Sequence, residues 1–184
     1  MVLEEVHNSL NVKMIIDFTR IIESQHDLDR DIFLKHNTNY SDTFVERKLA
    51  LLVELGELAN EVRSFKYWSL KNKSADEVII EEYADGLHFI SGFCVQYSVQ
   101  AIFSLKDDLV VIQDKHMINK KFNKLFKMIS DLKGNKDKKN IKLISAIYKK
   151  YVALGINLGF NIEQIKEAYF TKHEVNIKRQ ENKY

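Results

Sequence analysis

Two acidic clusters stand out in the sequence because their spacing is helical and their neighbours are mostly apolar. The first contains Glu54 and Glu57, and the second contains Glu82 and Asp85. Residues three or four positions apart lie on one face of a helix, so each pair would point in a single direction. Carboxylates gathered in this way are oxygen ligands of the kind that Mg²⁺ prefers. The pattern therefore predicts a divalent-metal site built by two helices.

A solvated acidic surface is the alternative interpretation, because charged residues on helices usually face water. Such a surface normally carries Lys or Arg three or four positions from each carboxylate. Around Glu54, Glu57 and Asp85 those positions hold apolar, amide, histidine or further acidic residues instead. Like charges at this spacing destabilise a helix by ~0.2–0.5 kcal/mol per pair. Two such clusters, each set among apolar residues, favour a metal site over a plain surface.

Long helices are expected to carry the clusters, since the chain has no proline and apolar residues recur at helical spacing. Sustained alternation of period two is hard to find, so we expect an all-α fold. The predicted architecture is an antiparallel bundle of about six helices in one domain spanning residues 1–184. Helices are expected over residues 13–34, 43–69, 74–99, 141–158 and 161–179, with a further helical region over 105–132 that breaks near 115–119.

A short connection joins the two helices that carry the clusters. Residues 70–74 leave room only for a tight link, which makes the two helices antiparallel neighbours. Capping boxes are predicted at Thr43, Ser74 and Asn161, because each is followed three residues later by Glu or Gln. Between Glu57 and Glu82 lie 24 residues. The part of the first helix after Glu57 and the part of the second helix before Glu82 are therefore of similar length. The two carboxylate pairs can therefore lie at one level.

Composition excludes several other classes of protein. The formal charge of +2 over 184 residues does not call for a nucleic-acid partner. The single cysteine, Cys94, cannot form an internal disulfide and fits a reducing cytosol. The sequence has no run of about 18 apolar residues and no signal-peptide core, so we expect a cytoplasmic protein without a membrane partner. Walker-type glycine loops and the H-E-x-x-H, Cys-x-x-Cys and G-x-S-x-G motifs are also absent from it.

The clusters and their surroundings resemble a known family. The run E-L-G-E at 54–57, followed by E-Y-A-D at 82–85, resembles the E-x-x-E…E-x-x-D metal motif of the all-α NTP pyrophosphatase superfamily, which includes MazG-like enzymes. Further runs narrow the resemblance to the dimeric (type 2) dUTP diphosphatases; they are L-L-V-E-L-G-E-L-A-N-E, F-K-Y-W-S, E-E-Y-A-D-G-L-H-F, Q-H-D-L-D and Y-F-T-K-H-E-V-N-I-K-R-Q. One position departs from the family, because the tail motif usually reads K-N-x-x-N and His173 replaces its first Asn.

The resemblance implies a Mg²⁺-dependent enzyme, with Mn²⁺ as a substitute metal. It implies hydrolysis of dUTP to dUMP and pyrophosphate, which keeps uracil out of DNA, and dUDP is a further candidate substrate. The active unit would be a homodimer. Glu54 would polarise the attacking water, while the bound metal offsets the charge on the phosphates. The implied metal ligands, which are also the implied catalytic residues, are Glu54, Glu57, Glu82 and Asp85.

The same resemblance implies roles for side chains that bind deoxyuridine nucleotides. They form four groups: Gln25 and Asp29 at the uracil edge, Lys66 and Trp68 at the phosphates and base, His88 and Phe89 beneath the deoxyribose, and Lys172, Asn176 and Arg179 as a phosphate clamp in the closing tail.

Two other functions stay open at this stage. A MazG-like pyrophosphatase acting on another nucleotide, such as dCTP, would keep the metal motif without the Q-H-D-L-D and F-K-Y-W-S runs. A non-enzymatic helical binding or regulatory protein would carry the carboxylates only as surface and would show no Mg²⁺-dependent turnover. The resemblance also allows a regulatory protein partner, because some members of the family come from phages and engage such proteins.

Overall fold

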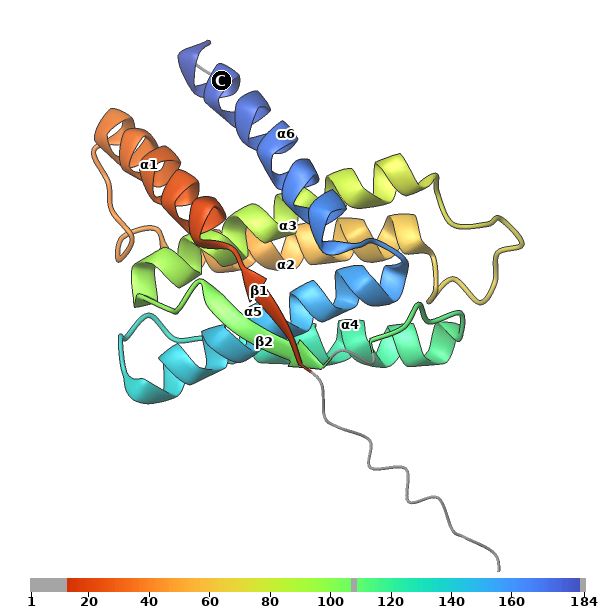
Figure 1. Cartoon of the computed structure of the whole chain (residues 1–184). Coiled ribbons are helices and arrows are strands. Elements are labelled where there is room, and N and C mark those ends of the chain that lie inside the picture. Colours follow the sequence, from red (N-terminus) through yellow and green to blue (C-terminus); the bar gives the residue numbers. More distant parts are fainter. Residues whose placement is uncertain (1–12, 107–108, 183–184) are drawn as a thin grey trace, which may run out of the picture.

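The structure is a computed structural model that describes residues 13–106 and 109–182. Within these ranges the chain forms six helices and two short strands (Figure 1). The all-α prediction is thus confirmed, with one small sheet added. The elements are β1 (Lys13–Asp17), α1 (Thr19–His36), α2 (Phe44–Val62), α3 (Asp76–Tyr97), β2 (Ile102–Lys106), α4 (Lys115–Ser130), α5 (Lys138–Leu158) and α6 (Ile162–Glu181).

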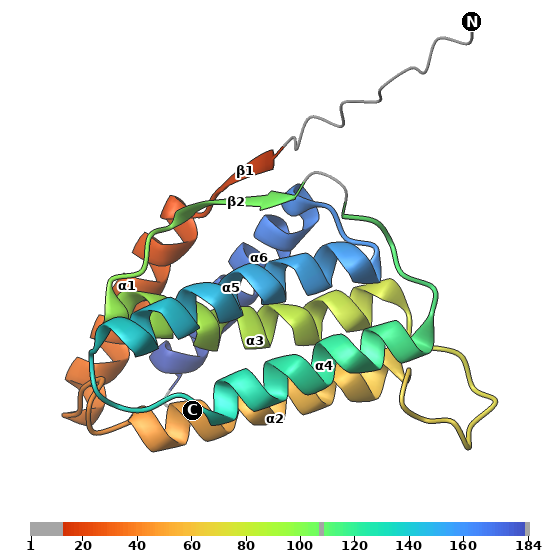
Figure 2. The ribbon, with the colours of Figure 1, turned by 90° about the horizontal axis from the view of Figure 1, so that it is seen from below.

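Four of the helices form a bundle. Helix α2 packs on α3, α3 on α5, α5 on α4, and α4 on α2, so the contacts close into a ring, as Figure 2 shows. Apolar side chains at helical spacing fill its centre. In α2, for example, Leu51, Leu55 and Leu58 are completely buried, as an amphipathic helix with one inward stripe requires.

Helix α3 is the central element, because it also contacts α1 and α6, which extend from the bundle as two arms (Figure 1). A helix covered on most sides must be apolar around most of its circumference, and the buried positions of α3 do run around it. Two tyrosines fix α3 against α5. The Tyr83 hydroxyl donates to the Tyr151 carbonyl (3.1 Å), and the Tyr151 hydroxyl donates to the Tyr83 carbonyl (2.8 Å).

The small antiparallel sheet was not expected. Its register runs from Lys13 opposite Lys106 to Asp17 opposite Ile102. The prediction of a helix from residue 13 is therefore wrong for residues 13–17, and α1 begins only at Thr19. Period-two alternation is masked in β1 because Ile15, on the outward face, is apolar like the buried Ile16.

Two other helix boundaries also differ from prediction. Helix α2 ends at Val62 instead of near Ser69, because Arg63 adopts a left-handed conformation with φ of 58° and caps the helix. Tyr67 and Trp68, in the aromatic run that follows, are exposed, so burial of these side chains does not favour a longer helix. The helical region expected over 105–132 contains a strand, an irregular segment and a helix that starts only at Lys115.

Of the three predicted capping boxes, only the one at Asn161 is present, where the Asn161 and Gln164 side chains bond each other's backbone N–H. The Thr43 hydroxyl instead donates to the Asn39 carbonyl in the preceding turn (2.8 Å). The Ser74 hydroxyl donates to the Glu61 carboxylate and so ties the 63–75 connection back to α2. At neither position does the hydroxyl accept a backbone N–H of the helix, because Thr43 has a ψ of 12° instead of the extended conformation of a capping residue, and the N-cap of α3 is Ala75, one residue after Ser74.

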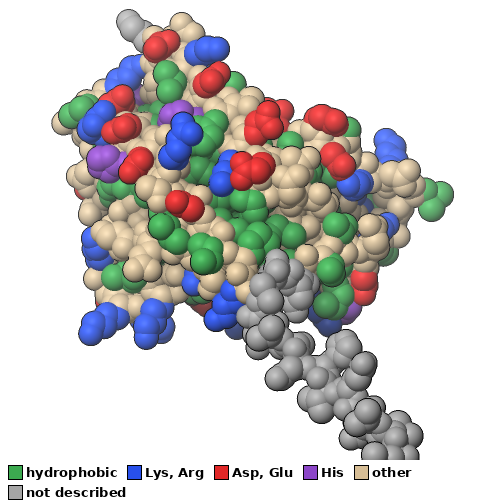
Figure 3. Space-filling model, in the orientation of Figure 1, with side chains coloured by type: hydrophobic (Ala, Val, Ile, Leu, Met, Phe, Trp, Pro, Cys, Tyr) green, Lys and Arg blue, Asp and Glu red, His purple; other side chains and the backbone are tan. Residues whose placement is uncertain are grey.

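Charge is unevenly distributed over the fold. Residues 115–150 contain twelve lysines and two aspartates, which leaves 16 basic and 24 acidic residues for the rest of the chain. Figure 3 shows the result on one face: Lys and Arg side chains gather along the lower edge, whereas acidic side chains are frequent in the upper half. Helix α3 accounts for most of the acidic excess, with five carboxylates and no Lys or Arg, so the surface around it attracts cations. Within the described ranges, none of the helices is both long and apolar enough to cross a membrane.

Gly155 provides a test of the packing between α5 and α3. A Cβ atom at this position would lie 2.8 Å from the Tyr83 ring and 2.9 Å from Ile165. Overpacking of this kind costs roughly 1–3 kcal/mol, so Gly155→Ala should lower the free energy of unfolding in urea by about that amount. The matched control is Gly56→Ala on α2, where a Cβ meets nothing within 4 Å and where Ala should stabilise the helix by up to about 1 kcal/mol. Equal effects of the two substitutions would contradict this packing.

Candidate active site

The antiparallel pairing of α2 and α3 brings the two acidic clusters together. Glu54 from α2 and Glu82 and Asp85 from α3 each offer one carboxylate oxygen, and these atoms all lie within 4.8 Å of one another. Glu57 lies next to this trio on α2 and is exposed. The arrangement places one oxygen-rich corner between two helices, as the spacing of the clusters predicts.

Burial and mutual repulsion make these carboxylates reluctant to ionise. Burial, followed by the charges of Asp85, Glu57 and Glu82, raises the pKa of Glu54 to about 7. The pKa of Glu82 is raised as well, again first by burial and then by neighbouring carboxylates. A divalent cation would reverse these shifts, because it favours the ionised form of every group around it. The donor set, all carboxylate oxygen, fits Mg²⁺ or Mn²⁺.

The cation nearest this cluster comes from α6. Lys172 Nζ lies 2.7 Å from Asp85 Oδ2 and 3.3 Å from Glu81 Oε1. Burial alone would lower the pKa of Lys172, but the two carboxylates outweigh it and the net shift is upward. Burial raises the pKa of Asp85, and Lys172 offsets part of that rise. No Lys or Arg stands three or four positions from Glu54, Glu57 or Asp85 in the sequence, and a helix remote in sequence supplies a positive charge to Asp85 instead.

A pocket of about 540 Å³ adjoins the cluster, with walls from α1, α2, α3 and α6. Glu54 and Asp85 form one wall, so the carboxylates and the pocket belong to a single site. A larger hollow of about 800 Å³ near the 63–75 connection contains none of the four carboxylates. Among the substrate-binding residues expected from sequence, those that line the pocket are Gln25, Asp29, His88, Phe89, Asn176 and Arg179.

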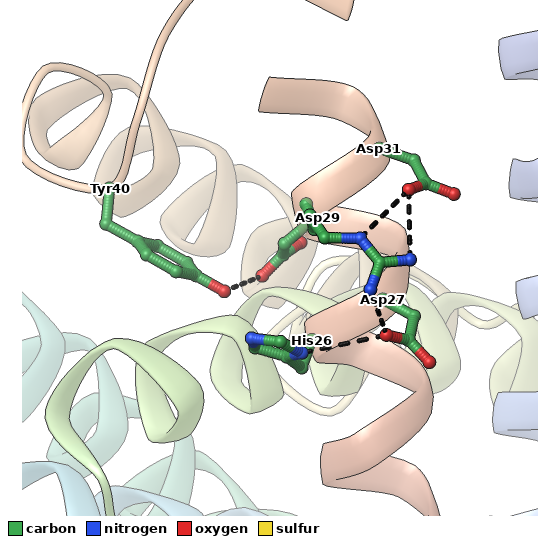
Figure 4. Close-up of polar contacts among 6 residues, drawn as sticks. His26, Asp27, Asp29, Asp31 and Tyr40 are labelled. Atoms are coloured by element: carbon green, nitrogen blue, oxygen red, sulfur yellow. Dashed lines mark hydrogen bonds and ion pairs between the residues drawn. The ribbon is translucent and has the colours of Figure 1, made fainter. Parts of the chain in front are cut away.

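Asp29 is the best-positioned acceptor in this pocket. Its Oδ1 accepts a hydrogen bond from Gln25 Nε2 (2.7 Å), and its Oδ2 accepts one from the Tyr40 hydroxyl (2.8 Å). Figure 4 shows Tyr40 directed at Asp29, whereas Asp27 and Asp31 on the same helix take part in other contacts. Burial raises the pKa of Asp29, and the bonds from Gln25 and Tyr40 oppose that rise.

Gln25, in contrast, is held inside the protein. Its Oε1 lies 2.8 Å from His88 Nδ1 and accepts a bond from the Tyr169 hydroxyl at 3.0 Å. Burial lowers the pKa of His88 to about 3, so its ring is neutral near pH 7 and carries one hydrogen. The ring stacks on Tyr169 with centroids 4.1 Å apart. Gln25 and His88 therefore support Asp29 from behind as well as lining the pocket.

Three of the expected residues do not line this pocket. Lys66 and Trp68 lie in the connection after α2, and the Trp68 side chain is 64% exposed. Lys172 lies behind Asp85 as its ion-pair partner. His173, which departs from the family pattern, stacks near Tyr169 and His88, and its Nδ1 is buried without a hydrogen-bond partner in the described part of the chain.

Sequence reasoning missed three residues of the site. Tyr40 and Tyr169 make hydrogen bonds to Asp29 and Gln25, and no spacing rule links these positions. Arg47 lines the same pocket. A signal for Arg47 was available, because it precedes Glu54 by seven residues and so lies on the same face of α2, two turns away.

The raised pKa of Glu54 predicts how the stability of the metal-free protein depends on pH. The folded-state pKa, about 7, lies above the ordinary glutamate value of 4.5, so ionisation costs stability as pH rises through 7. In EDTA, the wild type should lose thermal stability between about pH 5 and about pH 8, and Glu54→Gln should lose less. Adding Mg²⁺ should restore the wild type at the higher pH. Glu167→Gln, which changes an exposed residue of α6, is the control. Identical melting profiles for the wild type, Glu54→Gln and Glu167→Gln would show that the pKa of Glu54 is not raised in the folded protein.

Comparison with known proteins identifies the family. A family model described as dUTPase matches residues 17–184, which include all six helices and with them the acidic cluster and the pocket. No match to a curated protein was found. The resemblance carried by the sequence motifs is therefore confirmed, and the chain belongs to the dUTPase family and is a dUTP diphosphatase.

Proposed function

We propose that the enzyme hydrolyses dUTP to dUMP and pyrophosphate with Mg²⁺ held by the carboxylate cluster, that Mn²⁺ can replace Mg²⁺, and that dUDP is a second substrate. The observation that carries the proposal is the cluster itself, with three carboxylate oxygens within 4.8 Å at the wall of the pocket. Glu57, one turn from Glu54, is proposed as the fourth ligand. The proposed metal ligands are Glu54, Glu57, Glu82 and Asp85.

The residues of the chain divide the chemistry among them. A bound divalent metal supplies charge neutralisation for the phosphates. Glu54, which would be ionised beside a divalent metal, would polarise the attacking water by accepting a hydrogen bond from it. Asp85 holds Lys172 close to the same corner. With Asp85 as a metal ligand, Lys172 would be available to contact phosphate together with Asn176 and Arg179.

The nucleoside is proposed to occupy the 540 Å³ pocket. Asp29 accepts a hydrogen bond from the uracil N3–H, with Gln25 holding Asp29 in place. His88 and Phe89, both on α3, form the floor beneath the deoxyribose. An aromatic and an imidazole ring at this level leave little room for a 2′-hydroxyl, which supports a preference for dUTP over UTP.

Lys66 and Trp68 are proposed to act on the site of a second copy of the chain. In the single chain they lie outside the pocket. Helix α2 carries an exposed apolar stripe at Val45, Leu49 and Val53, four residues apart. Exposed apolar surface of this kind is typical of an interface. We therefore propose a homodimer that buries this face of α2.

A cytoplasmic location and a single domain complete the proposal. Cys94 is a buried free thiol, which is consistent with a reducing compartment. The described helices share one continuous buried core that includes residues from α1 to α6, which supports a single domain.

Removal of a metal ligand tests the proposed chemistry. Glu57→Gln and Asp85→Asn should each lower kcat for dUTP by about a hundredfold or more, since a metal contributes several kcal/mol to catalysis. Pyrophosphate release would be measured with Mg²⁺, with Mn²⁺ and in EDTA, using dUTP, dUDP, dCTP, dTTP and UTP. Glu77→Gln, an exposed carboxylate in the first turn of α3, is the control and should keep wild-type turnover. Near-normal Mg²⁺-dependent hydrolysis by either ligand variant would show that the metal lies elsewhere.

A second test addresses the dimer. At micromolar concentration the wild type should sediment as a dimer, whereas Leu49→Lys should sediment largely as a monomer, because a buried charge at an interface is costly. Val111→Lys is the matched control, since Val111 is also an exposed apolar residue but lies outside α2. A wild-type monomer with full activity would eliminate the dimer and the role of Trp68 across it.

A further inference from the structure

The loop between α1 and α2 supports one wall of the 540 Å³ pocket proposed for the base, called the base pocket below, through Tyr40, which does not itself line the pocket. Tyr40 reaches from this loop to Asp29, and its hydroxyl donates a hydrogen bond to Oδ2 over 2.8 Å. Its ring packs edge-on against Phe33 of α1, with centroids 4.7 Å apart. A loop residue needs external support to hold a fixed hydrogen bond, because loops are less constrained than the elements that they connect.

Arg47 of α2 provides that support. Its Nη2 donates to the Tyr40 carbonyl (2.8 Å) and to Gln96 Oε1 on α3 (2.6 Å), and its Nε donates to Thr43 Oγ1 (3.1 Å). The guanidinium lies over the Tyr40 ring at 4.9 Å and over the Phe93 ring at 4.7 Å. Arg47 thus grips both the backbone and the ring of Tyr40. A planar fork with several donors is required for this, and lysine does not have one.

Arg47 also acts on Asp29 through its charge. The carboxyl of Asp29 is buried, which raises its pKa, whereas the charge of Arg47 opposes that rise. The other groups that face this carboxyl are His26 and Gln25 on α1 and Tyr40 in the loop. Helix α3 presents Gly92, where a Cβ atom would lie 3.0 Å from Oδ2, and α6 contributes Arg179 to the same pocket.

We propose that Arg47 and Tyr40 are positioning residues that set the base preference of the enzyme, because they hold Asp29 in the pocket as a hydrogen-bond acceptor. This inference rests on the proposed contact between Asp29 and the base. It adds two residues that neither the motifs nor the family match assigns to the site.

The chemistry of the two pyrimidines explains why the state of Asp29 matters. Uracil carries a hydrogen on N3 and needs an acceptor, whereas N3 of cytosine is itself an acceptor. An ionised carboxylate only accepts, with about four lone-pair positions, while a protonated one also donates. Gln25 and Tyr40 use two of these positions, so others remain for N3–H of uracil. At N3, cytosine could accept a hydrogen bond only from the protonated form.

The inference is tested with Arg47→Met, Arg47→Lys and Tyr40→Phe. For each variant, kcat and KM would be measured for dUTP and dCTP from about pH 5.5 to about pH 8.5. Arg47→Met removes the hydrogen bonds that the charged guanidinium donates, and a bond to a charged group contributes enough to change affinity about tenfold. We therefore expect KM for dUTP to rise about tenfold and the dUTP-to-dCTP preference to fall about tenfold, with kcat nearly unchanged. The pH below which the preference declines should move upward, because the Asp29 carboxyl loses the charge that favours its ionised form.

Arg47→Lys keeps the positive charge, so the pH below which the dUTP preference declines should return in part toward the wild-type value. KM should stay raised, because lysine cannot make the same contacts with the backbone and ring of Tyr40. Tyr40→Phe removes one hydroxyl and should have a smaller effect in the same direction. Lys48→Met is the matched control, since Lys48 is the next residue of α2 but bonds the Ser130 and Leu132 carbonyls, away from the pocket. It should keep the wild-type preference. Circular dichroism and melting temperature establish that each variant is folded, and Tyr40→Phe carries the test should Arg47→Met fail to fold.

Two results would overturn the inference in different ways. In the first, the wild type prefers dUTP and Asp29→Ala loses that preference, but Arg47→Met or Tyr40→Phe keeps both the preference and its pH limit. Asp29 would then recognise the base without help from Arg47 and Tyr40, and the proposed function would stand. If the wild type itself does not prefer dUTP over dCTP, the proposed base contact fails and the inference fails with it.

Discussion

The arrangement of the molecule depends on holding three carboxylates within 4.8 Å of one another on two packed helices. Such a cluster opposes folding, because burial and like charges both disfavour the ionised groups, as the pKa of about 7 for Glu54 indicates. The rest of the fold makes the cluster tolerable. The reciprocal bonds between Tyr83 and Tyr151 fix α3 within the bundle, and Lys172 from α6 places a positive charge on Asp85.

Helix α6 connects the carboxylate cluster with the pocket proposed for the base. One turn separates Lys172, which pairs with Asp85, from Tyr169, which bonds Gln25 and also donates to the Ile21 carbonyl (3.2 Å). Both contacts reach elements that are distant in sequence. A shift of α6 would therefore affect both places at once. It would move Lys172 relative to Asp85 and Tyr169 relative to Gln25.

Spacing along the chain was sufficient to predict the features that lie on one helix. The pairs on α2 and α3, the buried stripe of α2 and the capping box at Asn161 depend on residues within a few positions of each other. Features that depend on distant partners could not be predicted in this way. Lys172 on Asp85 and Tyr40 on Asp29 are examples. The β1 strand escaped for a different reason, because Ile15 faces outward and hides the alternation.

The connection after α2 contains the run F-K-Y-W-S, which resembles the family although its position relative to the active site does not follow from the sequence. Lys66 and Trp68 match the family run, yet neither lines the pocket of its own chain. The apolar side chains of this connection, Phe65, Tyr67, Trp68 and Leu70, are all exposed. Exposed aromatic and aliphatic side chains of this kind are common at association surfaces. The Trp68 ring contacts Phe65 and Tyr67 of the same run, so the run packs on itself without reaching the pocket of its own chain. Its role at a site therefore depends on the partner proposed for the α2 face.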